Sequence, residues 1–352
     1  MNSPSNQRPV VGRLSPWLVG GDVITNIVDP SQVGEARRVA SEFARRVGAN
    51  EAQLGRVAIV ATEMATNIVK HAGGAGGMIA IDRFSDARGS GLELLAIDKG
   101  PGIADVGISL ADGYSTAGSA GTGLGAISRQ ADQFAVYSRS GLGTVVLARF
   151  ALLPPAADAP AIDFGVVRAT YPGETVCGDD WAFNAGPHGR TLLVVDGSGH
   201  GPLAAQAAEV ATKIFGEYAS EDCVALVERI HRGLAATRGA ALAVARIDGA
   251  QRVIRFVGVG NIAGVLMIGI EARQMVSHNG TAGHVAPRIR EFTYPFSGAP
   301  CVILHSDGLS NRWRMADYPG LVACHPSLIA GVLFRDFRRA RDDATIAVMR
   351  PR

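Results

Sequence analysis

The chain has 352 residues, of which 47% are hydrophobic and 19% are charged. At roughly 150 residues per domain this length predicts about two domains, and the ordinary globular composition excludes a chain that is disordered throughout. With 34 basic and 32 acidic residues the formal net charge is only +2. That balance excludes a nucleic-acid binder that works through bulk charge.

The cysteines and the chain start indicate a compartment. Four cysteines are scattered without a CxxC pair or a zinc-site spacing: Cys177, Cys223, Cys301 and Cys324. This pattern suits a reducing environment rather than a disulfide framework. The N-terminus is polar and rich in proline, without the apolar core of a signal peptide. The longest apolar stretch, residues 262–270, is about half of what a membrane crossing needs. We expect a cytoplasmic protein that uses no membrane.

Composition divides the chain into two domains. Residues 1–13 read as a flexible leader, and residues 152–163, rich in proline and alanine, read as a short linker. The segments that remain, 14–151 and 164–352, are both of ordinary domain size.

The first domain opens with a strand at 23–28 and helices at 31–47 and 51–71. Strands at 78–84 and 91–98, a helix around Leu124 and two strands that end near Phe150 complete it. Helices segregated against a mixed or antiparallel sheet favour an α/β sandwich. The helix at 51–71 carries an apolar stripe at spacings of three and four, formed by Leu54, Val57, Ala61, Met64 and Ile68.

Beside that stripe, Glu63, Asn67 and His71 follow one another at intervals of four residues, in one row along the helix. An amide oxygen can bind Mg²⁺, and a carboxylate one turn away can accept a proton from an attacking hydroxyl. For these three residues alone, a solvated polar face is the alternative interpretation.

Two glycine motifs favour a nucleotide site. Residues 98–103 (DKGPGI) end an apolar strand with Asp98, which can accept a hydrogen bond from an exocyclic amine, followed by a tight turn. Residues 121–126 (GTGLGA) precede a helix whose free N–H groups could hold phosphates. The second motif is neither a Walker A motif nor a convincing Rossmann turn.

Taken in order, TEMATNIVKHA, DKGPGI and GTGLGA resemble the GHKL ATPase and kinase superfamily, in its branch of small serine kinases and anti-sigma factors of the RsbT and RsbW type. The resemblance covers about residues 20–150 and implies the Bergerat fold with ATP and Mg²⁺. It places Asn67 on Mg²⁺, Asp98 on adenine and Glu63 as the base for a substrate serine. Around the nucleotide it places Gly100, Gly102, Gly121, Thr122, Gly123 and Gly125, with Lys70 near a phosphate.

The second domain alternates differently. We expect strands at 164–169 and 191–196, helices at 202–218 and 222–236, and strands at 240–247, 253–259, 263–268 and 302–306. A helix at 327–338 and a strand at 344–349 end the chain. Runs of strands with helices between them fit two packed sheets covered by helices.

Acidic residues stand at four strand ends of this domain: Asp179 and Asp180, Asp196, Asp307, and Asp342 and Asp343. Each alone could be a turn or a cap. Together at one spot they would repel one another without a cation. Because all ligands are oxygens, they would select Mg²⁺ or Mn²⁺, and a metal pair can drive attack at phosphorus.

The motifs PGETVCGDD, DGSGHG, GVGN, HSDGL and DDAT resemble the protein phosphatase 2C superfamily in its SpoIIE and RsbX branch, across about residues 164–350. The resemblance implies an α-β-β-α sandwich that binds two Mn²⁺ or Mg²⁺. Its metal ligands would be Asp179, Asp196, Asp307 and Asp342, with the Gly197 carbonyl. Within the two Asp-Asp pairs the choice stays open, with the first member preferred. His200, between glycines, is assigned to a turn without a catalytic role.

The two resemblances together imply a bifunctional partner-switching regulator, a phosphoserine or phosphothreonine phosphatase fused to a serine kinase domain. Its partner would be a STAS-domain phosphoprotein, an anti-anti-sigma factor or stressosome component, with a sigma factor as a further candidate and a homodimer left open. Three alternatives remain: a phosphatase with an ATP-sensing domain, an anti-sigma-type sequestering module, and a metabolic ATPase. The third is disfavoured because the first domain lacks room for transducer domains.

Overall fold

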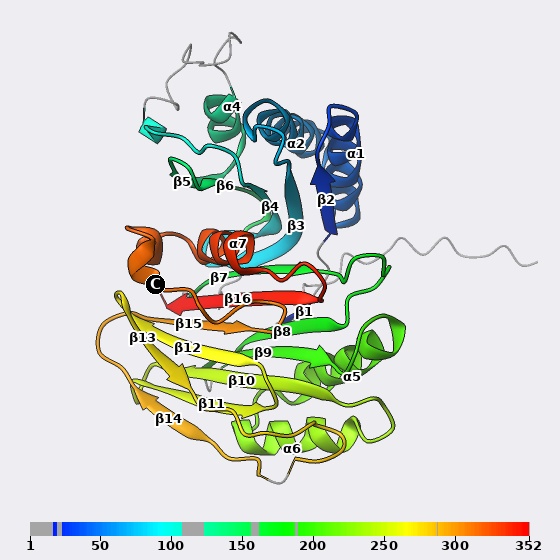
Figure 1. Ribbon diagram of the computed structural model, residues 1–352, viewed down its shortest axis with the longest axis vertical. Coiled ribbons are helices and arrows are strands. Elements are labelled where there is room, and N and C mark those ends of the chain that lie inside the picture. Colours follow the sequence, from blue (N-terminus) through cyan, green and yellow to red (C-terminus); the bar gives the residue numbers. More distant parts are fainter. Residues whose placement is uncertain are drawn as a thin grey trace, which may run out of the picture.

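The structure is a computed structural model and describes residues 17–19, 23–107, 123–155, 162–186, 189–286 and 288–351. Figure 1 shows one sheet with its helices at one end of the long axis, two further sheets toward the other end, and a helix between these two parts. This mixed α/β arrangement confirms the expected fold class.

An antiparallel sheet of five strands forms the first part. Its spatial order is β2 (Val23–Ile27), β3 (Gly77–Asp86), β4 (Gly89–Asp98), β6 (Gly143–Leu153) and β5 (Gln133–Arg139). Three helices pack on one face of it and enclose a hydrophobic core: α1 (Ser31–Arg46), α2 (Glu51–His71) and α4 (Gly123–Gln130).

The side chains of β4 alternate between the two faces of the sheet. Leu94 and Ala96 belong to the core under the helices, whereas Leu95 and Ile97 belong to the core on the opposite face. Successive strand residues point to opposite faces, so Asp98, the last residue of β4, lies on the helix side. Asp98 therefore lies on the face of the sheet that carries α2.

Two packed sheets form the second part. The first has the order β1 (Trp17–Val19), β8 (Asp179–Gly186), β9 (Gly189–Gly197), β10 (Ala240–Asp248), β11 (Val253–Val259) and β14 (Phe292–Pro295). The second has the order β13 (Glu271–Met275), β12 (Ala263–Ile268), β15 (Pro300–His305), β16 (Ala344–Pro351) and β7 (Ile162–Ala169). Helices α5 (Pro202–Tyr218) and α6 (Cys223–Gly233) cover the outer face of the first sheet.

Helix α7 (Pro326–Phe337) is shared by both parts. Every residue from Pro326 to Arg335 is buried, which marks a helix enclosed by protein rather than one with a solvent face. A single hydrophobic cluster joins Leu95 and Val145 of the first sheet through α7 to Ile346 of β16. The position of α7 between the two parts is visible in Figure 1.

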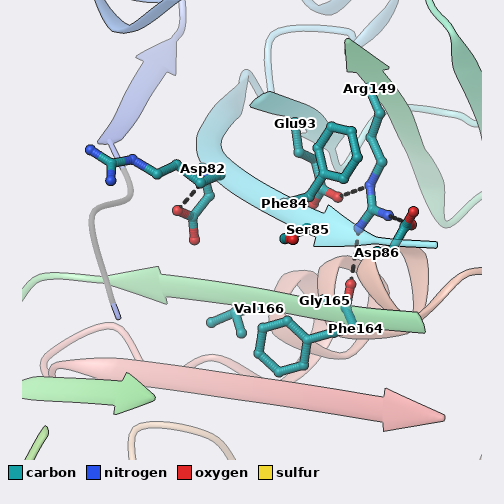
Figure 2. A pocket seen from close by; sticks show the side chains of 10 residues that line it. Asp82, Phe84, Ser85, Asp86, Glu93, Arg149, Phe164, Gly165 and Val166 are labelled. Atoms are coloured by element: carbon teal, nitrogen blue, oxygen red, sulfur yellow. Dashed lines mark hydrogen bonds and ion pairs between the residues drawn. The ribbon is translucent and has the colours of Figure 1, made fainter. Parts of the chain in front are cut away.

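A buried ion-pair cluster closes the same interface. Arg149 on β6 donates to Glu93 (Nε–Oε2, 2.6 Å) and to Asp86 (Nη1–Oδ2, 3.1 Å). Its Nη2 also donates to the backbone oxygen of Phe164 on β7, at 2.9 Å, as Figure 2 shows. Ser327 at the start of α7 donates to the same Glu93 oxygen at 2.8 Å. One arginine therefore joins both parts of the chain.

The structure differs from the sequence expectation at several short strands. Residues Trp17–Val19, assigned by sequence to the first domain, pair with β8 of the second part. Both ends of the proposed linker, residues 152–163, belong to strands, because β6 runs to Leu153 and β7 begins at Ile162. The strands β8, β13 and β14 were not expected either. The leader 1–13 and residues 156–161 lie outside the described residues, and the domain bounds stay a prediction. No helix in the described ranges is long and apolar enough to span a membrane.

Candidate nucleotide and metal sites

Helix α2 sets the position of the candidate kinase residues. Its first turn is closed by a capping box in which Asn50 and Gln53 exchange side-chain-to-backbone hydrogen bonds, both 2.9 Å. Its apolar stripe is buried from Val57 onward, and Glu63 and Asn67 lie half-buried at the edge of that stripe. Lys70 and His71 are exposed at the end of the helix.

Glycines allow close packing around α2 and around the turn that follows Asp98. A Cβ on Gly123, the first residue of α4, would lie 2.8 Å from Asn67 Oδ1, and a Cβ on Gly100 would lie 2.7 Å from the His71 carbonyl oxygen. Gly102 has φ +70°, and a Cβ there would lie 2.0 Å from the Arg139 carbonyl oxygen. The start of α4 therefore approaches Asn67, and the turn after β4 approaches the end of α2, as closely as only glycine allows.

Asp98 is held in place for an acceptor role. Its Oδ1 accepts from the backbone N–H groups of Gly100 (2.8 Å) and Thr144 (3.3 Å). Burial raises the pKa of Asp98, and these two hydrogen bonds oppose the rise. Gly125 is buried in α4, which suits helix packing rather than ligand contact. Gly121 and Thr122 lie outside the described residues.

The acidic residues of the second part come from both packed sheets. Asp179 on β8 pairs directly with Asp196 on β9. Asp307 follows β15, and Asp342 precedes β16. Asp196, Asp307 and Asp342 line one cleft. The strand ends thus gather the acids that the sequence placed far apart.

The electrostatics of this cluster call for a cation. Burial raises the pKa of Asp196, and the charges of Asp179, Asp307, Asp342 and Asp343 raise it further. Burial and the charges of Asp307 and Asp343 likewise raise the pKa of Asp342. Like charges in a buried place disfavour ionisation unless an opposite charge is near. The cluster is therefore unstable as a set of free carboxylates.

In the described part of the chain, two carboxylate oxygens of the acidic cluster have no hydrogen-bond partner. Oδ1 of Asp179 and Oδ2 of Asp343 are buried and have no hydrogen-bond partner among the described residues. In that part of the chain, no three His, Cys, Asp or Glu side chains are arranged as a group that could hold a metal ion. Unpaired buried oxygens are nevertheless costly, and carboxylate oxygens are the donors that a hard metal ion prefers.

Hydrogen bonds distinguish the members of each Asp-Asp pair. Asp180 is engaged by Arg168 (3.0 Å) and Thr212 (3.1 Å). Asp343 is buried, and its Oδ1 accepts from the backbone N–H of Tyr171 at 2.7 Å. Asp342, by contrast, faces the cleft. This geometry favours Asp179 and Asp342 as ligands, the preference drawn from the sequence, and the assignment stays a prediction.

Neighbouring polar groups orient two of the acids. The Ser306 hydroxyl donates to Asp179 Oδ2 at 2.6 Å, and Asn261 Nδ2 donates to Asp307 Oδ2 at 2.7 Å. A Cβ on Gly197 would lie 2.1 Å from the Ala204 carbonyl oxygen, so the start of α5 packs directly on the turn after β9. Sequence reasoning missed the contact between Asn261 and Asp307, because 46 residues separate the two.

His200 is a second residue whose surroundings the sequence did not predict. It lines the cleft with Asp196, Asp307 and Asp342, and its Nδ1 lies 2.7 Å from Glu174 Oε1. The sequence assigned it to a turn because glycines flank it. Those glycines do have positive φ angles, +91° at Gly199 and +74° at Gly201, but the turn presents the imidazole to the cleft.

Comparison with known proteins gives matches for both parts. Residues 28–150 match the family of the histidine kinase-like ATPase domain. The chain is 35% identical over 113 residues to the serine/threonine-protein kinase RsbT of Bacillus subtilis (strain 168), covering 32% of this chain and 84% of RsbT. It is 27% identical over 146 residues to the phosphoserine phosphatase RsbX of the same organism, covering 41% of this chain and 73% of RsbX.

Solved structures match as well, and one of them reaches a TM-score of 0.50. It was described under the words "The bacterial stressosome: a modular system that has been adapted to control secondary messenger signaling". It is 26% identical, with a TM-score of 0.50, and covers 53% of this chain and 98% of its own.

Proposed function

The chain belongs to the family of RsbT-type kinases with a histidine kinase-like ATPase domain, fused to a part similar to the phosphatase RsbX, and we infer that it is a bifunctional partner-switching regulator. The phosphatase part would remove phosphate from serine or threonine of a STAS-domain protein, and the kinase part would restore it. The observation that carries the proposal is the cleft in which Asp196, Asp307 and Asp342 meet.

In the phosphatase reaction the carboxylates hold the metals. Asp179, Asp196, Asp307 and Asp342, with the Gly197 carbonyl, would bind two Mn²⁺ or Mg²⁺, which supply an activated water and neutralise charge on the phosphate. Ser306 and Asn261 keep Asp179 and Asp307 in fixed orientations. Because no cysteine or serine nucleophile is needed, the four free cysteines stay outside the reaction.

In the kinase reaction the residues around α2 hold ATP and Mg²⁺. Asp98 would accept a hydrogen bond from the adenine amine and Asn67 would bind Mg²⁺. Gly100, Gly102, Gly121, Thr122 and Gly123 would surround the nucleotide, with Lys70 near a phosphate, while Gly125 would allow α4 to pack close by. Glu63, one turn before Asn67, would take the proton of the attacking serine hydroxyl. We place the reaction in the cytoplasm, where ATP is present and the four cysteines remain thiols.

A second candidate function is a phosphatase with a first domain that senses ATP or sequesters its partner without transfer. The close packing of Gly123 on Asn67 and of Gly100 on the end of α2 would serve nucleotide binding in either case. Glu63 favours the kinase, because a sensor needs no base. A stressosome partner, a sigma factor and a homodimer belong to the same proposal.

The deciding experiment is phosphate transfer from labelled ATP to a STAS-domain protein of the same genome. The assay uses an Asp196→Ala variant, so that the phosphatase cannot remove the label. We expect labelled partner protein, and we expect the label to disappear when Glu63→Gln is added, while ATP binding persists. Bound ATP without transfer would contradict the kinase and leave the sensing or sequestering function.

A further inference from the structure

A second groove adjoins the metal cleft, and neither of the proposed reactions uses it. The cleft has a volume of about 690 Å³ and the groove has a volume of about 630 Å³. The half-buried Tyr171 lines both of them, so the groove begins where the cleft ends. Asp179, which the proposed function assigns to the metals, also lines the groove. Volumes of this order are typical of sites that bind ligands.

Both parts of the chain form this groove. Ile24 and Asn26 on β2 belong to the first part, whereas the turn before β8 and one side of α5 belong to the second. Elsewhere the two parts are in close contact, since a Cβ on Gly165 would lie 2.2 Å from the backbone nitrogen of Ser327. The groove is therefore an open place along an otherwise tightly packed boundary, and it lies beside the metal site.

The two arginines of the groove are already engaged. Arg168 forms an ion pair with Asp180, with Nη1 and Oδ1 3.0 Å apart. Arg338 is half-buried, and its Nη2 donates to the Thr170 carbonyl at 3.2 Å. Burial lowers the pKa of Arg338, and the nearby charge of Asp343 opposes the change. Neither guanidinium therefore attracts an acidic ligand into the groove.

One acid of the groove is not engaged in this way. The Glu174 carboxylate lies 2.7 Å from His200 Nδ1. The side chain of Glu209 on α5 is exposed, and within the ranges that the structure describes it has no ion-pair or hydrogen-bond partner. Val176, which is 39% exposed, adds an apolar side chain to the lining. A carboxylate next to apolar surface fits arginine or lysine, whose aliphatic stem packs on apolar groups while the cation stays in water.

We propose that this groove binds an arginine or lysine side chain of the protein substrate while the neighbouring phosphoserine occupies the metal cleft. Glu209 pairs with the cation, Val176 contacts its aliphatic stem, and Asn26 brings the first part to the edge of the bound segment. The inference rests on the proposed phosphatase function. It adds a preference for the residues around the phosphoserine, which the metals cannot supply because they act on the phosphate.

The test uses short phosphoserine peptides of equal length that differ at one position. That position carries arginine in one peptide and glutamate in the other, and it is moved along the peptide on both sides of the phosphoserine. With Mn²⁺ present, we expect kcat/KM to be about two- to fivefold higher for the arginine peptide where the side chain reaches the groove, the range of an exposed ion pair. The difference should lie in KM, because the pair forms on binding and not in the transition state alone.

Three variants locate the effect in the groove. Glu209→Arg should reverse the preference, so that the glutamate peptide becomes the better substrate. Glu217→Arg makes the same change of charge on the same helix, outside the groove, and should keep the preference. Asn26→Asp adds a carboxylate from the first part and should increase the preference for arginine. The rate on p-nitrophenyl phosphate, which has no flanking residues, should be the same in the unmodified protein and in every variant.

The outcomes separate this inference from the function on which it rests. If the unmodified protein hydrolyses the peptides but shows no preference for arginine at any position, the phosphatase stands and the groove is not a substrate site. A preference that Glu209→Arg leaves unchanged, or a reversal that Glu217→Arg shares, overturns the inference in the same way. If the unmodified protein with Mn²⁺ hydrolyses neither the peptides nor p-nitrophenyl phosphate, the phosphatase function and this inference are both wrong.

Discussion

Asp196 is the residue at which burial and like charge are most concentrated. It lies beside Asp179 in the sheet register, and four neighbouring carboxylates add to the effect of burial on its pKa. Asp180 has Arg168 as a counter-charge, whereas the acids that raise the pKa of Asp196 face the same cleft or lie just behind it. In the metal-free protein this residue therefore opposes folding whenever it is ionised.

The consequence is a pH dependence of stability with a definite sign. An aspartate has a pKa of about 4 in the unfolded chain, and Asp196 and Asp179 both have raised pKa values in the fold. The native state then binds more protons, so the stabilising contribution is full below about pH 4 and is lost as pH rises through the native pKa. We expect the free energy of unfolding, measured in urea with EDTA, to fall as pH rises from about 4 to the native pKa. The fall is up to about 1.4 kcal/mol per pH unit for each proton.

Asp196→Asn should flatten that dependence and stabilise the metal-free protein at pH 8, although phosphatase activity is lost. Added Mn²⁺ should stabilise the unmodified protein more at high pH than at low pH, because metal binding displaces protons. A pH slope that is identical in the variant and the unmodified protein would contradict the electrostatic account of the cluster.

At the residue scale, the sequence predicted the acidic residues of the cleft but not the side chains that contact them or lie beside them. Asp196, Asp307 and Asp342 could be selected because each flanks an apolar strand within a recognisable motif. His200 contacts Glu174, which is 26 residues away, and no local pattern links the two. Side chains that act through a distant partner leave no periodic signal.

Among the elements, α2 was predicted almost to the residue, because its stripe of buried side chains and its capping box are both local. The strands β1 and β13 were not predicted, each for its own reason. β1 has three residues and a partner strand that begins 160 residues later, at Asp179. β13 exposes four of its five residues, so it shows no alternation. Short strands are specified by their neighbours rather than by their own residues.

Helix α7 offers a test at the level of one element. A Cβ on Gly331 would lie 2.8 Å from Val145 Cγ1 and 3.2 Å from Leu95 Cδ2, so Gly331→Ala should overpack the interface. We expect a loss of about 1–3 kcal/mol in unfolding free energy, which outweighs the helix propensity gained. Gly55→Ala in α2, where a Cβ meets nothing within 4 Å, should instead stabilise by about 0.5–1 kcal/mol. Denaturant unfolding of both variants measures the two changes. If both variants gain or both lose unfolding free energy, the packing argument is wrong.

For the molecule as a whole, the segment between Asp307 and Asp342 links the phosphatase part to the sheet of the first part. It leaves the metal cleft, passes along β5, where the Tyr137 hydroxyl donates to the Pro319 carbonyl at 3.3 Å, and returns through α7. Arg149 adds a buried polar link between β6 and β7. A shared core of this kind makes the two parts unfold together rather than as independent domains.

The three tryptophans allow that expectation to be measured. Trp181 lies on β8, Trp313 lies between β15 and α7, and Trp17 lies on β1, which pairs with β8. Tryptophan fluorescence therefore reports on the phosphatase part, whereas nucleotide would bind to the other part. If the parts share one transition, ATP and Mg²⁺ should raise the midpoint seen by fluorescence as much as the midpoint seen by circular dichroism. At a hundredfold excess over Kd the added stability is about 2.7 kcal/mol.

Two variants sharpen this measurement. Asn67→Ala, which removes the proposed Mg²⁺ ligand, should abolish the nucleotide shift in both signals. Arg149→Met removes the buried ion pairs of Arg149 with Glu93 and Asp86, which costs about 3–5 kcal/mol, and should lower both midpoints together. A fluorescence midpoint that ignores nucleotide while the circular dichroism midpoint moves would mean that the two parts unfold separately. The core around α7 would then bind them too weakly for either site to influence the stability of the other.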